Sequence, residues 1–175
     1  CCCFRYNKPY FFKAGIPMFR ELTRIKQKLP REESIGILKQ ELRGVLYLIG
    51  DDGYPYGMPM DHWYNDSDGC LYFHSNKKGH KVDAMNRCPK ASYCVYDRGF
   101  LREGEWALNI RSVIVFGRIE IVEDYDTAMA IVRQLSLKYT DDISYIDREI
   151  QQSGKNTLVF RLVCEHITGK LVNES

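Results

Sequence analysis

The sequence predicts a small antiparallel β-barrel with peripheral helices, in the mainly β (α+β) class. Short apolar or alternating segments recur between explicit turn sequences such as DDG and NDSDG, a pattern typical of an antiparallel meander. Four segments with helical periodicity lie before or between these strands. The chain has 175 residues, 45% of them hydrophobic and 27% charged. These proportions suit one globular domain and exclude disordered, collagenous and coiled-coil chains.

The first predicted element is an amphipathic helix that begins after Pro30 and ends near Arg43. Acidic residues in its first turn and apolar residues at helical spacing support it. Six strands are then expected, at residues 44–50, 54–64, 70–75, 91–97, 112–124 and 157–170. The further helices are expected at residues 79–88, 126–140 and 143–151. Gly117 interrupts the longest alternating strand, where we expect a bulge or bend.

The charges are too evenly balanced to imply an obligatory nucleic-acid or membrane partner, and we expect neither. The net charge is only +2, although residues 1–43 hold ten basic and four acidic side chains. No apolar run reaches the ~18 residues of a membrane span, and the start shows no signal-peptide pattern. We therefore expect a cytoplasmic protein with a basic N-terminal extension at residues 1–29 and one domain at residues 30–175.

The seven cysteines do not form a pattern that holds a metal. Three are adjacent at the start of the chain, and the others show no C-x-x-C pair and no histidine at a ligand-like offset. A reducing compartment without structural disulfides is the expectation. His62, His80 and His166 are interpreted as ordinary surface or interface histidines.

The chemistry-bearing residues concentrate at one corner between a strand and a helix. Residues 73–81 (FHSNKKGHK) end a predicted strand and open a predicted helix, so free backbone N–H groups, a hydroxyl and ammonium groups converge there. Gly79 permits a close approach, and Ser75 with Lys78 or Lys81 supplies direct contacts to an anion such as phosphate. The alternative is a solvated surface corner in which Ser75 merely caps the helix.

Several motifs in the chain occur in a recognisable order. They are D-G-Y-P-Y-G-M-P (52–59), G-C-L-Y-F-H-S (69–75), G-H-K (79–81), and R-S-V (111–113) followed by Gly117, Val122 and Asp124. Together they resemble the flavin-binding split-barrel proteins related to pyridoxamine phosphate oxidase, and most of all the 5-nitroimidazole-resistance proteins. The resemblance covers about residues 30–170. It implies a six-stranded antiparallel split β-barrel with peripheral helices that binds FMN.

Carried over by position, the resemblance implies a complete flavin site. The corner at 75–81 would hold the FMN phosphate, residues 58–61 would lie along the isoalloxazine ring, and residues 73 and 74 would flank it. Residues 106, 111 and 112 would complete the site from a second chain. The implied cofactor-binding residues are Met58, Pro59, Met60, Asp61, Phe73, His74, Ser75, Lys78, Gly79, Lys81, Trp106, Arg111 and Ser112.

A homodimer with the flavin at the subunit interface is the expected assembly. The resemblance implies it, and strand 112–122 carries apolar side chains beyond those that a small barrel needs to fill its core. These are Val113, Val115, Ile119 and Ile121.

The function implied by the resemblance is an NAD(P)H-dependent reductase of nitro-aromatic or other small oxidised substrates. His74 is the expected proton donor, and the aromatic, polarizable lining formed by Met58, Tyr64, Phe73 and Trp106 suits a flat heteroaromatic substrate. Three alternatives remain open. They are a non-catalytic flavin-binding or redox-sensing protein, a heme-binding relative, and a pyridoxamine phosphate oxidase proper, against which the ending ITGKLVNES argues.

Overall fold

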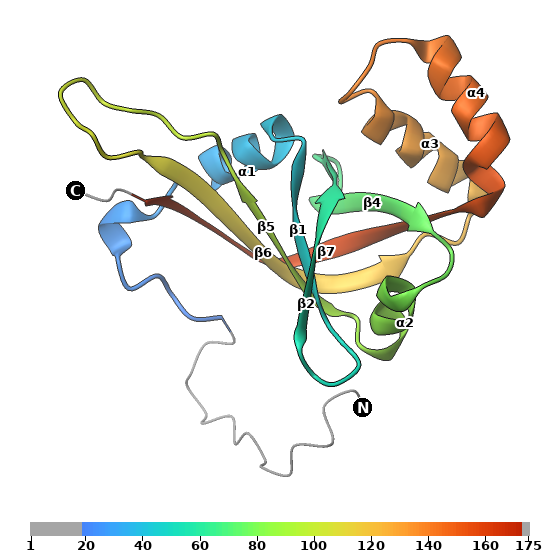
Figure 1. Cartoon of the computed structure of the whole chain (residues 1–175), viewed down its shortest axis with the longest axis horizontal. Coiled ribbons are helices and arrows are strands. Elements are labelled where there is room, and N and C mark those ends of the chain that lie inside the picture. The colour runs from blue at the N-terminus through green and yellow to red at the C-terminus, as the bar shows by residue number, and fades with distance from the viewer. Residues whose placement is uncertain (1–18, 173–175) are drawn as a thin grey trace.

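Seven antiparallel strands form one curled sheet in this computed structural model, which describes residues 19–172 (Figure 1). The order across the sheet is β2-β1-β5-β6-β7-β4-β3. The strands are β1 (Arg43–Ile49), β2 (Pro55–Asp61), β3 (Trp63–Asn65), β4 (Cys70–Asn76), β5 (Lys90–Tyr96), β6 (Ile110–Ile121) and β7 (Thr157–Val172). The helices are α1 (Arg31–Gln40), α2 (His80–Arg87), α3 (Tyr125–Ser136) and α4 (Ile143–Ser153), with 3₁₀ turns at Ile25–Gln27 and Gly154–Asn156.

The expected number of six strands is wrong by one, because the segment 54–64 is two strands separated by His62. β2 pairs with β1 at one edge of the sheet, and β3 pairs with β4 at the other edge. One residue therefore carries the chain from the first edge of the sheet to the last, and the two edges come close together at this residue without pairing. The sequence shows no turn signal at His62, and for this reason the alternating pattern predicted a single strand. The split-barrel prediction itself is confirmed.

The core fills the inside of the curl, and the two faces of β4 are buried differently. Leu71 and Phe73 point into the main core, while Cys70 and Tyr72 pack with α3 on the other side. This alternation is the period of two that every strand shows. His74 follows in register on the same face as Tyr72 and is exposed.

β6 contributes its apolar side chains to the core of its own chain. Val113, Val115 and Ile119 are buried there, so the expectation that they are surplus to the barrel is wrong. Only Ile121 of the four remains exposed. The expected bulge at Gly117 is confirmed, since the register against β7 shifts between Phe116 and Gly117. A Cβ at Gly117 would lie 2.0 Å from the Val163 carbonyl oxygen.

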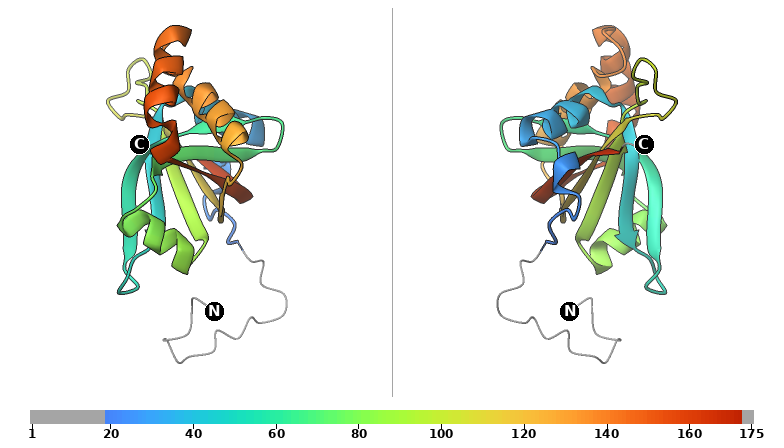
Figure 2. Two further views of the ribbon diagram at one scale, coloured as in Figure 1. Left: turned by 90° about the vertical axis from the view of Figure 1, so that its right-hand side faces the viewer. Right: turned by 90° about the vertical axis from the view of Figure 1, so that its left-hand side faces the viewer.

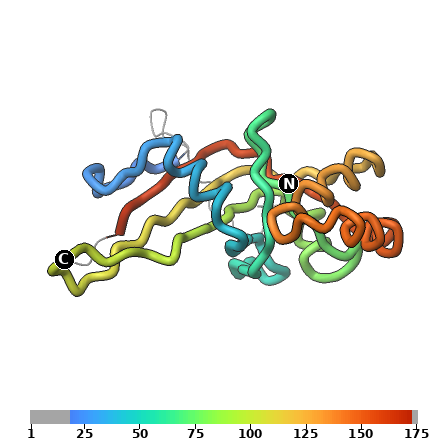
Figure 3. Tube along the Cα trace, turned by 90° about the horizontal axis from the view of Figure 1, so that it is seen from above, coloured from blue at the N-terminus to red at the C-terminus, as the bar shows by residue number. Residues whose placement is uncertain are grey.

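The helices α3 and α4 form a pair at one end of the sheet, and the loop between β5 and β6 projects as an arm from the other end (Figure 3). The predicted helix 126–140 ends at Ser136, because the residues after it bond to the crossover region of the sheet. Lys138 Nζ donates to the carbonyls of Glu41 (2.8 Å) and His62 (2.9 Å), and the Tyr139 hydroxyl donates to the Leu42 carbonyl (2.7 Å). α2 lies on the same side of the molecule as this pair (Figure 1), and Figure 2 shows the pair at the top of the molecule and α2 at the bottom.

Residues 19–29 of the predicted N-terminal extension lie along β7. The Leu29 N–H donates to the Gly169 carbonyl (3.0 Å), Leu29 joins the core, and the Phe19 ring stacks on His166 at 4.8 Å. The cysteine-rich start of the extension lies outside the described residues. Between residues 19 and 172, no helix has the length and apolar character needed to cross a membrane.

Candidate functional site

Predicted site residues from β2 and from the start of α2 meet beside β4. Lys81 Nζ lies 3.4 Å from Met60 Sδ, although the two residues are 21 positions apart. A thioether sulfur is a weak acceptor, and Lys81 has no carboxylate partner among the described residues. Burial lowers the pKa of this half-buried ammonium. The arrangement thus holds a cation that lacks an anion.

The corner after β4 has the open backbone that the sequence predicts. Gly79 precedes α2 with φ of +119°, a conformation that favours glycine, and a Cβ there would meet nothing within 4 Å. Lys78 beside it is exposed. The Ser75 hydroxyl donates to the Asn76 carbonyl (3.0 Å) and does not cap α2.

α2 is fixed to the hairpin between β1 and β2. The His80 ring stacks on Tyr56 at 4.2 Å and lies 3.6 Å from an Asp51 oxygen. At the other end of α2, Arg87 donates to Asp51 (2.6 Å) and to the Ile49 carbonyl (3.1 Å). These contacts hold Lys81 opposite β2.

Asp61 and His74 carry charges that affect each other. Partial burial disfavours ionisation of Asp61, but the bond from Arg43 Nε (2.6 Å) prevails and lowers the pKa of the carboxyl. His74 keeps an exposed surface, but the neighbours that cover the rest of its ring displace water from it and so lower its pKa; Asp61 opposes this effect, and Lys81 adds to it. His74 is therefore mainly neutral at pH 7, with a carboxylate and an ammonium nearby.

The other residues predicted to contact the flavin ring or the substrate differ in how far they are buried. Met58 and Met60 face the core side, and Pro59 faces outward. Phe73 is fully buried, with its ring stacked on Phe160 at 5.2 Å. Tyr64 is also buried in the core. Phe73 and Tyr64 therefore belong to the core and offer no free surface to a ligand.

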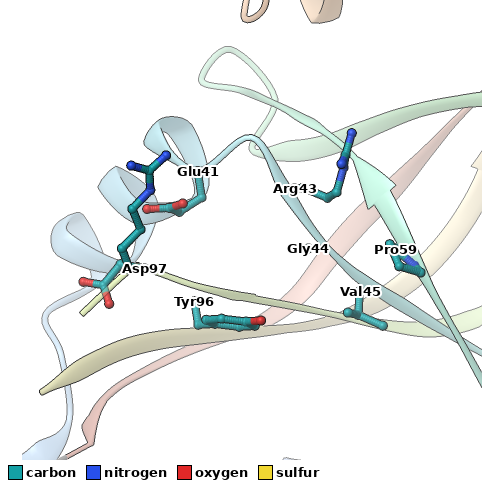
Figure 4. A pocket seen from close by; sticks show the side chains of 8 residues that line it. Glu41, Arg43, Gly44, Val45, Pro59, Tyr96 and Asp97 are labelled. Atoms are coloured by element: carbon teal, nitrogen blue, oxygen red, sulfur yellow. The ribbon is translucent and has the colours of Figure 1, made fainter. Parts of the chain in front are cut away.

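A separate hollow of about 350 Å³ lies on the outward side of β1, β2 and β5 (Figure 4). Of the predicted site residues it includes only Pro59, so it is distinct from the corner at 75–81. Its lining consists of Glu41, Arg43, Gly44, Val45, Pro59, Tyr96, Asp97 and Arg98.

The residues expected to complete the site from a second chain lie apart from the corner at 75–81. Trp106 is 83% exposed on the arm between β5 and β6, at the far end of the molecule from α2 (Figure 1). Arg111 bonds within its own chain, to Asp97 (2.7 Å) and to Glu33 (3.3 Å). Ser112 lies beside Arg111, paired with Tyr96 of β5. Within one chain the structure does not bring these residues to Lys81.

Three residues around β2 escaped sequence analysis. His62, interpreted as an ordinary surface or interface histidine, is instead fully buried inside its own chain, so that interpretation is wrong. Its Nδ1 lies 2.8 Å from the Tyr93 hydroxyl, which donates to the Met60 carbonyl (2.7 Å). Lys138 reaches the same region from the loop after α3. No local pattern indicates these contacts, since each joins residues far apart in the chain.

Among solved structures, the chain is similar to a candidate 5-nitroimidazole antibiotic resistance protein from Bacteroides thetaiotaomicron (TM-score 0.73, 22% identity, 83% of this chain and 87% of that chain). It is also similar to a conserved hypothetical protein from Mycobacterium tuberculosis (0.73, 20%, 86% and 90%). A third similar structure is an FAD-binding protein from Mesorhizobium loti (0.60, 24%, 83% and 97%).

These structural similarities show a shared fold. No curated protein sequence matches the chain. The model of one protein family, described as pyridoxamine 5'-phosphate oxidase, matches residues 30–171 and so covers most of the sequence. The chain therefore belongs to the pyridoxamine 5'-phosphate oxidase family.

Proposed function

We propose that this protein binds FMN and acts as an NAD(P)H-dependent reductase of small nitro-aromatic or similar oxidised compounds. One observation carries the flavin assignment. The half-buried ammonium of Lys81 has only the Met60 sulfur as a partner among the described residues, and this contact joins the corner at 75–81 to β2. A phosphate, with a charge of about −1.5 to −2, is the kind of partner that such a cation lacks.

The corner at 75–81 fits the phosphate end of FMN. Open space beside Gly79 leaves room for phosphate oxygens, and the first N–H groups of α2 point out of the helix start. The Ser75 hydroxyl can turn from its present acceptor to a phosphate oxygen. Lys78 adds a second ammonium at the surface of the corner.

β2 fits the ring end of FMN. It is the first strand in the sheet order, so the backbone of residues 58–61 has one side without a strand partner. Unpaired N–H and C=O groups along such an edge can bond the polar edge of a flavin ring. Flavin binding by relatives supports the assignment, since the proteins of similar fold include the FAD-binding protein from Mesorhizobium loti and an FAD- and heme-binding protein from Mycobacterium smegmatis.

When bound, FMN would supply the hydride and electron transfer, and the residues of this chain would bind, orient and protonate. Lys81 and the helix start would hold the phosphate. His74, exposed and close enough to Asp61 to feel its charge, would hold a proton for the substrate at a ring nitrogen. Asp61 is already bonded by Arg43 and would serve as a fixed negative charge near His74.

The proposed assembly is a homodimer that covers the outward face of β1, β5 and β6. Tyr47, Tyr96 and Ile114 are exposed on this face, which is continuous because Val45 pairs with Cys94 and Cys94 pairs with Ile114. In such a dimer the arm bearing Trp106 would reach the partner chain. Exposed apolar patches of this kind mark protein interfaces.

The cofactor and the reductase activity are tested with purified protein under anaerobic conditions. The absorbance spectrum of the purified protein, with mass identification of any bound group, would establish whether the cofactor is FMN, FAD or heme. NAD(P)H should then bleach the flavin, and a 5-nitroimidazole should restore its colour. A flavin that NAD(P)H bleaches but no nitro compound reoxidises would contradict the reductase assignment, and a flavin that is never bleached would indicate a binding protein.

A further inference from the structure

The junction between β2 and β3 is held by a buried hydrogen-bonded group. His62 is the single residue between strands at opposite edges of the sheet, and it is fully buried. Its Nε2 lies 2.6 Å from the Leu38 carbonyl of α1, so this nitrogen must carry a proton and donate it. Its Nδ1 lies 2.8 Å from the hydroxyl of Tyr93 on β5. Three elements distant in the chain thus meet at one imidazole.

The Tyr93 hydroxyl extends the group to β2. Tyr93 is fully buried, and its hydroxyl donates to the Met60 carbonyl at 2.7 Å. The side chain of the same Met60 contacts Lys81 Nζ, so both ends of this residue are fixed. Any movement of the Tyr93 hydroxyl would therefore reach the segment 58–61 directly.

Lys138 restrains the same junction from outside the barrel. Its ammonium donates to the carbonyls of His62 (2.9 Å) and Glu41 (2.8 Å). The backbone of His62 and the backbone of Met60 are thereby each bonded by a side chain from another element. Because the polar atoms of this junction have hydrogen-bond partners, the junction holds the adjoining strand β2 in one geometry.

The number of protons limits how the group is bonded. Burial, together with the charge of Lys138, lowers the pKa of His62 to about 3, so the imidazole is neutral at pH 7. With its one proton on Nε2, its Nδ1 can only accept. The Tyr93 hydroxyl has one proton and two acceptors, Met60 O and His62 Nδ1. The hydroxyl is therefore the shared donor on which the position of both residues depends.

We propose that Tyr93 and His62 are positioning residues of the flavin site: they hold the Met60 peptide, and with it the segment 58–61, at the angle that the flavin ring requires. This inference rests on the proposed FMN binding. It assigns the ring end of the site to a buried group behind β2 and leaves the phosphate end to Lys81. The two ends then make separable contributions to affinity.

The experiment measures the Kd of FMN and of riboflavin for the whole protein by quenching of flavin fluorescence. Tyr93→Phe removes only the hydroxyl, so the Met60 peptide is no longer held in place, and both flavins should bind more weakly by the same factor, about tenfold. His62→Gln, which keeps a donor and an acceptor, should fall between wild type and Tyr93→Phe. Lys81→Ala should weaken FMN much more than riboflavin. Tyr72→Phe is the matched control, because this buried tyrosine on β4 donates to Asp68, outside β2.

The outcomes separate the two proposals. If Tyr93→Phe binds both flavins like wild type, or loses no more affinity than Tyr72→Phe at equal loss of unfolding free energy, the positioning role is overturned. If Tyr93→Phe affects FMN alone, the assignment of the ring end to this group is overturned. If wild type binds neither flavin, the proposed function fails and this inference fails with it.

Discussion

The ring of Tyr93 passes directly beneath Gly44, and only the missing side chain of that glycine makes room for it. A Cβ at Gly44 would lie 2.7 Å from Tyr93 Cζ, 2.8 Å from its hydroxyl oxygen and 2.5 Å from the Cys94 carbonyl oxygen. Tyr93 thereby reaches across β1 to the Met60 carbonyl of β2. One small residue in β1 thus permits the contact that orients the neighbouring edge strand.

Gly44→Ala should therefore destabilise the fold. The added methyl group would have to displace a buried ring and a backbone carbonyl, and overpacking of this kind costs about 1–3 kcal/mol of unfolding free energy. Urea denaturation of the variant measures the cost. Gly36→Ala in α1, where a Cβ meets nothing within 4 Å, is the control and should be neutral or slightly stabilising. Equal midpoints for the two variants would contradict the close approach.

His62 should make the fold sensitive to acid. Its pKa is about 3 in the folded chain and near 6.5 when unfolded, so below pH 6.5 the unfolded state binds a proton that the folded state does not. The stabilisation is complete above pH 6.5 and is lost as pH falls toward 3, by up to ~1.4 kcal/mol per pH unit. Denaturation curves between pH 6.5 and 4.5 measure this slope, which His62→Gln should flatten. Parallel slopes for the two proteins would show that His62 does not titrate in this way.

Lys81→Ala should weaken FMN binding tenfold or more, because a charge-assisted contact of roughly 1.5–3 kcal/mol is lost. Riboflavin, which lacks the phosphate, should bind wild type less tightly than FMN does. Lys78→Ala is the matched control: Lys78 is exposed, so solvent screens its charge and the loss should be smaller. Unchanged FMN binding in Lys81→Ala would remove the phosphate assignment.

His74→Ala should retain FMN yet reoxidise about 10²-fold more slowly with a 5-nitroimidazole, the usual scale for one acid-base group. Because the pKa of His74 lies below its ordinary value, the protonated form is scarce at pH 8 and the wild-type rate should rise as pH falls toward 6. Anaerobic single turnover of chemically reduced protein measures both effects. His166→Ala, at the stack with Phe19, serves as control and should behave as wild type. Equal rates for His74→Ala and wild type would exclude the histidine from the reaction.

Light scattering should give the mass of two chains. Ile114→Glu places a charge on the outward face of β6 and should yield monomers, with weaker flavin binding if the site is shared. Ile121→Glu changes a residue of similar exposure near the other end of β6 and should leave the dimer intact. A wild-type monomer that keeps its flavin would show that one chain suffices for the site.

Local patterns alone located most elements and the corner of the candidate site. The bulge at Gly117, the start of α2 after Gly79 and the turns before β2 and β4 follow from residues within a few positions of each other. Glycine conformations, capping and alternation are short-range properties, so they can be read without knowing the fold. For the same reason the sequence placed Ser75, Lys78 and Lys81 together.

Only the tertiary structure decided which edge each strand joins and what lies behind it. Alternation through residues 54–64 continues across His62, and nothing local distinguishes one strand from two that join opposite edges of the sheet. The contacts of Met60 with Lys81 and with Tyr93 span 21 and 33 positions. A period of two assigns the residues of a strand to two faces but does not say which face is the core. The sequence therefore could not tell that Phe73 is buried and His74 exposed, which the packing of the sheet decides.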